Sequence, residues 1–186
     1  MNAPTHGANP AAGALAQRTA ALERCYRRVQ HERMGGLGLL NPALSVQALG
    51  FEPAAQNPTL AEGVLLTPWF MSLLRLPLRA QAPAGGRIGQ RSSHAFGNEC
   101  FDFLGAFDAE IGYYESCALF SPMHGFDSQP LALQTAQEVL RQLRQTPAAL
   151  ADAAADPGAE RSSAEARALA SRRAFFRYPL GGTGAA

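Results

Sequence analysis

The sequence has 186 residues, a length typical of one domain, and 17% of them are charged, below the roughly 25% of an average soluble domain. Its formal net charge of +1 argues against binding through general attraction to nucleic acid or to anionic lipid. All 16 cationic side chains are arginine, and a chain without lysine has neither a Schiff-base lysine nor a complete P-loop.

The first predicted element is an amphipathic helix near the N-terminus. Over residues 11–33, apolar side chains such as Leu15, Leu22 and Tyr26 recur at helical spacing, and a glycine pair then supplies a stop. The segment before it, 1–10, is small and polar with two prolines, so we expect a flexible N-terminal tail.

Strands follow this helix in the sequence. A β-leaning run over 45–51 and a continuous apolar run over 63–67 predict two strands, with a loop over 53–62 between them. A proline ends the second run, because proline lacks the donor that a central ladder needs. A third apolar run, 69–76, precedes a loop of glycine, proline and arginine over 79–95.

The clearest β signal is a hairpin over residues 99–120. Phe101, Phe103 and Phe107 share one face of its first strand, and its second strand is apolar on both faces, which predicts a central position in a sheet. Helical spacing returns over 130–145, with arginines near the C-terminal end, where the helix dipole favours them.

The C-terminal part of the chain completes the predicted domain. We expect a loose linker over 146–160, a short arginine-rich helix that ends in SRRAFFRYP, and a flexible C-terminal tail over 177–186. Together the elements predict a single α+β domain over 11–176. An antiparallel sheet of about four to five strands is covered there by N- and C-terminal helices.

The sequence indicates a cytoplasmic protein. Its three cysteines are widely spaced without a CxxC pair, which fits reduced thiols. Arg27-Arg28 superficially resembles a twin-arginine export signal, but no apolar run of roughly 7 to 15 residues follows it. The longest apolar stretch, 63–78, is shorter than the ~20 residues of a membrane span and is interrupted by two prolines and an arginine.

Few residues have the spacing of a catalytic or metal site. The one set with metal-ligand chemistry is His94, Cys100, Cys117 and His124. Both cysteines fall in predicted strands, where a thiol behaves as a small buried hydrophobe, and both histidines fall in loops. Cys117 and His124 are also a conceivable nucleophile and base, yet no third orienting group is identifiable. We therefore expect no metal, no cofactor and no catalysis.

Two short stretches carry unusual apolar surface. TPWFMSLLRLP holds the only tryptophan, and SPMHGF repeats its pattern of a strand end, a proline break and a methionine or aromatic residue. Such side chains suit the capture of apolar peptide segments, and burial in the core is the alternative that the pattern leaves open. The large side chains concerned are Trp69, Phe70, Met71, Met123 and Phe126.

Four blocks of the sequence carry a resemblance to a known family. They are LLNPALSVQALGFE (39–52), GVLLTPWFMSLLRLP (63–77), SCALFSPMHGF (116–126) and RRAFF (172–176). In order and spacing they resemble the HybE/HupJ family of [NiFe]-hydrogenase maturation chaperones. The resemblance does not divide the shared positions into fold and contact residues. Those positions are Asn41, Pro42, Thr67, Pro68, Trp69, Cys117, Ser121, Pro122 and Met123.

The resemblance implies a non-catalytic helper in the assembly of an uptake [NiFe]-hydrogenase. The partner it implies is the iron–sulfur small-subunit precursor, whose leader carries a twin arginine and an apolar segment, bound before export. The alternatives are assistance to the large subunit and protection of iron–sulfur cofactor assembly against oxygen, since some relatives are linked to a rubredoxin-like protein. More distant alternatives are a thiol enzyme that uses Cys117 and a structural subunit of the finished hydrogenase.

We expect the Thr-Pro and Ser-Pro breaks to end two adjacent strands. Trp69, Phe70 and Met71 would then lie beside Met123 and Phe126 as one exposed apolar patch, which holds the apolar part of the leader.

Charged side chains are expected around this patch. An acidic side chain would meet the twin arginine, and the candidates are Asp102, Glu110 and Glu115. Arg75 stands where the family pattern is usually apolar, and we expect its charge at the rim of the patch.

Overall fold

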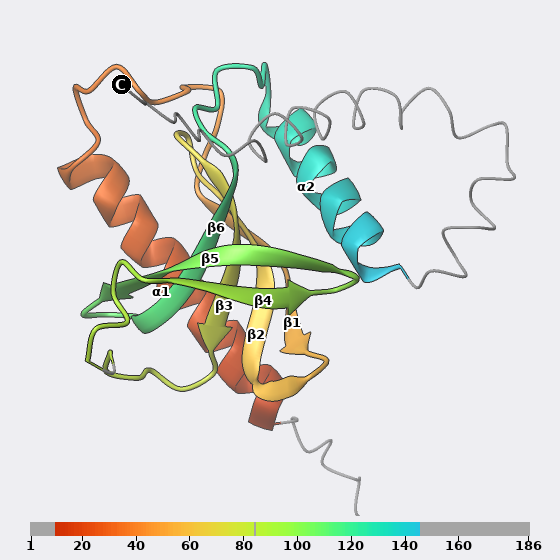
Figure 1. Cartoon of the computed structure of the whole chain (residues 1–186). Helices are drawn as coiled ribbons and strands as arrows, with labels where there is room; N and C mark the ends of the chain where they lie inside the picture. Colours follow the sequence, from red (N-terminus) through yellow and green to blue (C-terminus); the bar gives the residue numbers. More distant parts are fainter. Residues whose placement is uncertain (1–9, 84, 146–186) are drawn as a thin grey trace, which may run out of the picture. The chain divides into compact units, whose positions relative to one another are not determined.

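The computed structural model describes residues 10–83 and 85–145, which form two helices and six strands (Figure 1). In chain order these elements are α1 (Pro10–Glu32), β1 (Gln47–Ala54), β2 (Asn57–Leu66), β3 (Met71–Pro77), β4 (Arg91–Phe96), β5 (Glu99–Asp108), β6 (Gly112–Phe120) and α2 (Gln129–Arg144). Neither described helix combines the length and the apolar character that a membrane span needs.

The six strands form one antiparallel sheet in the order β1-β2-β3-β6-β5-β4. β6, the second strand of the predicted hairpin, lies between β3 and β5, so its predicted central position is confirmed. The α+β class, the antiparallel sheet and the two helices are confirmed as well. The sheet has six strands rather than the four to five predicted.

Two segments predicted as loops contain strands. The predicted 53–62 loop is a tight hairpin, in which β1 runs to Ala54 and β2 starts at Asn57. Pro53 is tolerated there because β1 is an edge strand, on which some N–H groups have no ladder partner. β4 lies inside the predicted 79–95 loop, and its sequence, RSSHAF, lacks the apolar run by which a strand is recognised.

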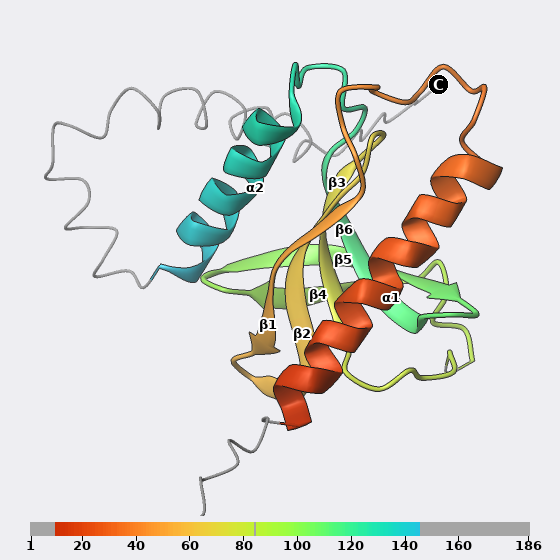
Figure 2. The same cartoon turned by 180° about the vertical axis from the view of Figure 1, so that it is seen from behind.

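Each helix packs on one face of the sheet. Leu73 and Leu74 are neighbours in β3, so their side chains point to opposite faces. Leu74 belongs to a core cluster with Leu22 of α1, and Leu73 belongs to a second cluster with Ala136 of α2. Figure 2 shows α1 crossing in front of the strands, on the side that is turned away in Figure 1. Leu73 and Leu74 are both fully buried, which explains why this strand is apolar on both faces at its centre.

The C-terminal end of α2 is held by the tip of the β4–β5 hairpin. Asn98 donates its backbone N–H to the Leu143 carbonyl at 2.8 Å and its side-chain amide to the carbonyls of Gln142 and Gln145. These bonds satisfy carbonyls that the last turn of a helix leaves without partners. Gly97 precedes Asn98 with a φ of 62°, and a Cβ there would collide with the Leu143 carbonyl. The hairpin tip therefore fixes where α2 ends.

The helices predicted over 11–33 and 130–145 are confirmed to within two residues at each end. Of the predicted N-terminal tail only Pro10 is described, as the first residue of α1. The linker predicted over 146–160, the arginine-rich segment after it and the tail at 177–186 lie outside the described residues.

Candidate functional site at one end of the sheet

Three loops that contain the NP, TPWF and SPMHGF sequences lie at one end of the sheet, named here the motif end (Figure 1). They are the loop after α1 (33–46), the β2–β3 turn (67–70) and the β6–α2 loop (121–128). Met71 at the start of β3 pairs with Phe120 at the end of β6, so the Thr-Pro and Ser-Pro breaks end adjacent strands, as predicted. The Ser121 hydroxyl also lies 3.5 Å from the Trp69 carbonyl oxygen.

Asn41 connects the three loops. Its backbone N–H donates to the Pro68 carbonyl at 2.9 Å. Its side-chain amide donates to the carbonyls of Met123 at 3.0 Å and Phe126 at 2.7 Å. Asn41 is only 7% exposed, so these hydrogen bonds are shielded from competing water. A buried asparagine is therefore the structural centre of the motif end.

Thr67 shapes the β2–β3 turn through its hydroxyl. The hydroxyl accepts the Phe70 backbone N–H and donates to the Phe70 carbonyl, with both distances 2.9 Å. The backbone N–H of Thr67 donates to the same carbonyl at 2.8 Å. Because Thr67 and Pro68 are buried, this part of the motif determines the fold of the turn.

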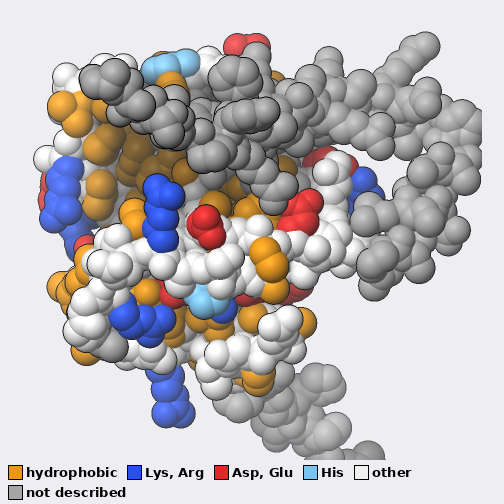
Figure 3. Space-filling view, viewed as in Figure 1, with side chains coloured by type: hydrophobic (Ala, Val, Ile, Leu, Met, Phe, Trp, Pro, Cys, Tyr) orange, Lys and Arg blue, Asp and Glu red, His pale blue; other side chains and the backbone are white. Residues whose placement is uncertain are grey.

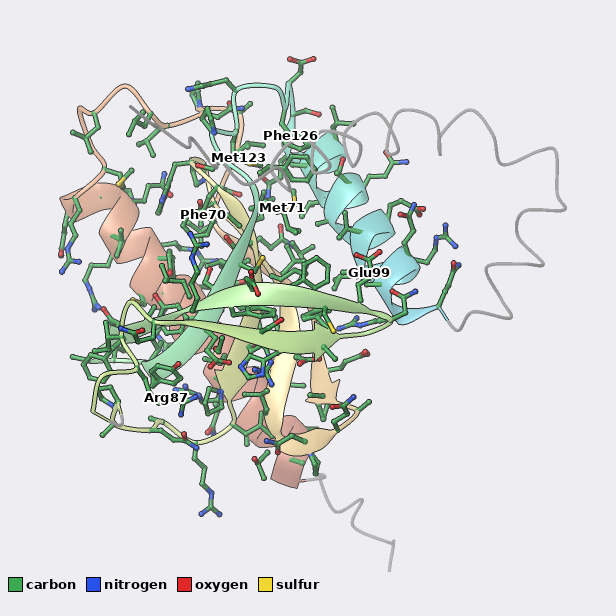
Figure 4. The ribbon with its side chains drawn as sticks, viewed as in Figure 1. Phe70, Met71, Arg87, Glu99, Met123 and Phe126 are labelled. Atoms are coloured by element: carbon green, nitrogen blue, oxygen red, sulfur yellow. The ribbon has the colours of Figure 1, made fainter. Side chains whose placement is uncertain are left out.

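The five side chains expected as one exposed patch are divided between the two faces of the sheet. Met71 and Met123 are fully buried and Phe126 is 5% exposed, all in the cluster that includes α2 (Figure 4). Trp69 and Phe70 are half-buried and pack against the other cluster, with α1. The prediction of a single exposed patch is therefore wrong. Neighbours at the start of an extended strand point to opposite faces, which separates Phe70 from Met71.

Trp69 and Phe70 form an aromatic cluster with Tyr26 of α1. The Phe70 ring lies edge-on to the rings of Tyr26 and Trp69, with centroid distances of 5.7 Å and 5.6 Å. Burial, followed by the charge and hydrogen bond of Tyr114, raises the pKa of Tyr26 far above its ordinary value. All three rings remain partly exposed, so the cluster presents an aromatic surface next to the motif end.

The loop after α1 adds two exposed leucines. Leu37 is 56% exposed and Leu39 is 47% exposed, and Leu131 in the first turn of α2 is 41% exposed. Figure 3 shows hydrophobic side chains gathered over this loop and in a hollow beside it, above β5. Neither exposed leucine of the loop was predicted from the sequence as a site residue. The sequence feature that indicates their exposure is GGLGLL. Its glycines disfavour a helix or strand that would bury the leucines.

The acidic residues expected to meet a twin arginine do not form a common site. Glu110 pairs with Arg28 at 2.6 Å and with Arg24 at 3.7 Å. Glu115 is 4% exposed and lies within a buried ion network. Asp102 is exposed on β5. Of the three carboxylates, only that of Asp102 has no ion pair with a described residue.

Arg75 lies inside this ion network and not at the rim of an exposed patch, so the expectation for Arg75 is wrong. Its guanidinium is 2.6 Å from Glu115 and 3.1 Å from Glu62. Arg87 and His94 approach the Glu115 carboxylate at 3.2 Å and 3.4 Å. Burial alone would raise the pKa of Glu115, but Arg75 and the other partners outweigh burial and hold this pKa below its ordinary value. The network places paired charges in the interior.

The four residues with metal-ligand chemistry are not brought together as a site. Within residues 10–83 and 85–145, no group of three or more His, Cys, Asp and Glu side chains is arranged to hold a metal ion. Cys100 and His124 are exposed, Cys117 is partly buried in β6, and His94 belongs to the ion network.

Cys25 is the cysteine whose chemistry the structure changes most clearly. It lies on the buried face of α1 and is 1% exposed, and burial, followed by the neighbouring Asp108, raises its pKa to about 11. We expect Cys25 to resist alkylation by iodoacetamide at mildly alkaline pH while the exposed Cys100 reacts, because only the thiolate is nucleophilic. Peptide mass spectrometry of the native and urea-unfolded protein measures this. Equal labelling of both residues in the native protein would contradict the assignment.

The chain matches one family over most of its length. The pattern of the family described as "[NiFe]-hydrogenase assembly, chaperone, HybE" covers residues 17–178. Protein HoxT of Cupriavidus necator is 40% identical over 139 residues, which are 68% of this chain and 75% of HoxT. The hydrogenase expression/formation protein HoxT of Azotobacter vinelandii is 39% identical over 163 residues, which are 87% of this chain and 95% of that protein.

A solved structure supports the same assignment at the level of the fold. The solution structure of HybE from Escherichia coli superposes with a TM-score of 0.55 at 18% identity, over 70% of this chain and 78% of HybE. The family match includes all three loops of the motif end, from the residue pair Asn41-Pro42 to the SPMHGF sequence. The chain therefore belongs to the HybE family of [NiFe]-hydrogenase assembly chaperones.

Proposed function

We propose that the chain is a non-catalytic maturation chaperone that acts in the cytoplasm on the small-subunit precursor of a [NiFe]-hydrogenase. It binds this precursor with its twin-arginine leader before export. Family membership supplies the role in hydrogenase assembly. The observation that carries the rest is the convergence of three motif-bearing loops on Asn41, beside the exposed side chains of Leu37 and Leu39.

The contact surface in this proposal consists of Leu37 and Leu39 together with the aromatic pair Trp69 and Phe70. The leucines are exposed on the glycine-rich loop after α1, and the rings are half-buried and packed against Tyr26. Burying leucine and aromatic side chains against an apolar leader segment yields about 1.5–3 kcal/mol for each side chain that becomes fully buried. Core side chains support these loops from below, namely Met71, Met123 and Phe126.

The acidic contact for the twin arginine falls to Asp102 in this proposal. Glu110 and Glu115 already pair with arginines of the chain, whereas Asp102 is exposed. An exposed carboxylate on its own contributes about 0–1 kcal/mol to such a pair, so the apolar surface supplies most of the affinity.

Protection of iron–sulfur assembly is the second candidate function, and one relative motivates it. A protein named "Probable rubredoxin HupJ" of Rhodobacter capsulatus is 31% identical over 123 residues, which are 66% of this chain and 43% of that protein. This chain has three cysteines, whereas iron–sulfur sites of the Cys₄ type need four thiolates. A direct role in iron binding would therefore need thiolates from a partner, and a Cys117→Ser variant that matures hydrogenase normally in air would argue against it.

Tagged co-purification tests the main proposal. The tagged chain is expressed with the hydrogenase subunits in two strains, one with the complete small subunit and one whose small subunit lacks its leader. We expect the small-subunit precursor to be captured from the first strain and not from the second. Capture of the large subunit alone, or of the small subunit without regard to its leader, would overturn leader binding.

A further inference from the structure

The two edges of the sheet differ in how they are protected. β1, at one edge, contains Pro53 and two register shifts, and both helices contact it. Such features block the addition of another strand. β4, at the other edge, pairs with β5 in an unbroken register from Arg91 to Phe96 and contains no proline. β4 is therefore a regular edge strand without the usual protection.

The register of β4 shows which backbone groups face outward. Phe96 and Glu99 flank a two-residue turn, so they form a hydrogen-bonded pair. The even-numbered residues of β4 therefore direct their N–H and C=O groups to β5. The hydrogen bond from the Gly105 N–H to the Gln90 carbonyl follows the same alternation. The N–H and C=O groups of the odd-numbered residues point to the free edge. These residues are Arg91, Ser93 and Ala95.

The part of the chain that leads from β3 into β4 carries charge of one sign. No acidic residue occurs between Glu62 and Glu99, and this interval carries the exposed arginines Arg79, Arg87 and Arg91. Arg79 and Arg91 have no ion pair with any described residue. Figure 4 places Arg87 at the far end of the molecule from Met123 and Phe126, and Figure 3 shows arginine side chains on that side.

The nearest acids of the sheet lie one or more strands inward from the free edge. Glu99 and Asp102 belong to β5, so β4 lies between them and the free edge. Glu115 is buried and already shared between Arg75, Arg87 and His94.

We propose that the free edge of β4 binds an extended acidic segment of a partner protein, which adds to the sheet as a seventh strand. Backbone hydrogen bonds to Arg91, Ser93 and Ala95 hold the segment, and an acidic side chain of the segment pairs with the exposed Arg91. In this mode of recognition, main-chain hydrogen bonds supply the affinity, and the side chains of alternate residues supply the selectivity. The edge contains none of the apolar contact residues Leu37, Leu39, Trp69 and Phe70, so the inference does not depend on the apolar part of the proposed function; Asp102, opposite Ser93 on β5, is the one residue next to the edge that the proposed function uses.

A peptide-binding experiment tests the inference on the full chain. The probe is a short fluorescein-labelled peptide of alternating glutamate and threonine, and a glutamine–threonine peptide is its neutral control. Fluorescence anisotropy at low salt is expected to show binding of the acidic peptide only. Ser93→Pro is expected to weaken this binding roughly tenfold, because proline removes an outward donor, whereas Ser93→Ala keeps the donor and the affinity.

Two further measurements separate strand addition from plain attraction between charges. Arg91→Gln is expected to reduce affinity by about two- to fivefold and to flatten its dependence on salt, without a change in the fold. Leader-dependent capture of the small subunit should persist in Ser93→Pro. The inference is overturned if the acidic peptide does not bind. It is also overturned if Ser93→Pro binds it as well as Ser93→Ala, because charge alone would then explain the affinity.

Discussion

Asn41→Ala is expected to lower the free energy of unfolding by about 2–4 kcal/mol, because it removes the partners of buried backbone groups. The carbonyl of the buried Phe126 loses its bond to the Asn41 side chain, and the N–H of the more exposed Ala43 loses one as well. The Met123 carbonyl keeps one donor, the Phe126 N–H at 3.2 Å, so losing the Asn41 bond destabilises it less. Urea unfolding followed by circular dichroism measures the change. The loops of the motif end should also lose their fixed positions.

The matched control for this variant is Asn57→Ala. Asn57 is exposed, and its side chain bonds only within its own turn, to Thr59. A surface change of this kind usually shifts stability by less than about 0.5 kcal/mol. If Asn41→Ala were as stable as Asn57→Ala, Asn41 would not be the structural centre of the motif end.

Glu115→Ala is expected to lower the free energy of unfolding by about 3–5 kcal/mol, because it leaves a buried cation without its closest partner. The Arg75 guanidinium is 2.6 Å from Glu115, and the side chain of Arg75 is only 13% exposed. Glu62, at 3.1 Å, remains as one acceptor, which keeps the expected loss at the lower end of this range. Glu138→Gln is the control, since Glu138 forms a surface pair with Arg141 that is worth less than about 1 kcal/mol.

Glu115 also makes stability depend on pH. Its pKa lies below the ordinary value of 4.5 in the folded protein, so its contribution is complete above that value and is lost as the pH falls through the folded pKa. Glu115→Gln cannot titrate, so the stability gap between wild type and this variant should narrow as the pH drops below 4.5. Chemical unfolding at a series of acidic pH values tests this. A gap that stays constant would show that the Glu115 carboxylate gains nothing from its partners.

The elements with strong apolar periodicity were predictable from the sequence. Leu22 marks the buried face of α1 by its helical spacing, and β3 is rich in leucines that are fully buried. β4 was not predicted because its sequence, RSSHAF, has only one large apolar residue, Phe96. The strand is stabilised by its pairing with β5. An edge strand needs less apolar character than a central one, because it does not hold the middle of the core.

The candidate site was only partly predictable, because its main contacts join distant parts of the chain. The adjacency of the Thr-Pro and Ser-Pro breaks followed from the apolar runs before them. Asn41 bonds to residues 82 and 85 positions away, and no local pattern identifies such partners. Arg75 and Glu115, 40 positions apart, look solvated in the sequence, and only the pairing of β3 with β6 brings them together in the interior.

The central claim is that the motif end binds the small-subunit precursor. Affinity measurements with the purified full chain and the purified precursor test it most directly, with Leu37→Ser/Leu39→Ser compared against Ile88→Ser. Ile88 is 52% exposed, much like the two leucines, but lies in the loop before β4. The double variant is expected to bind at least roughly tenfold more weakly, with Ile88→Ser unchanged. Wild-type affinity in the double variant would contradict the claim.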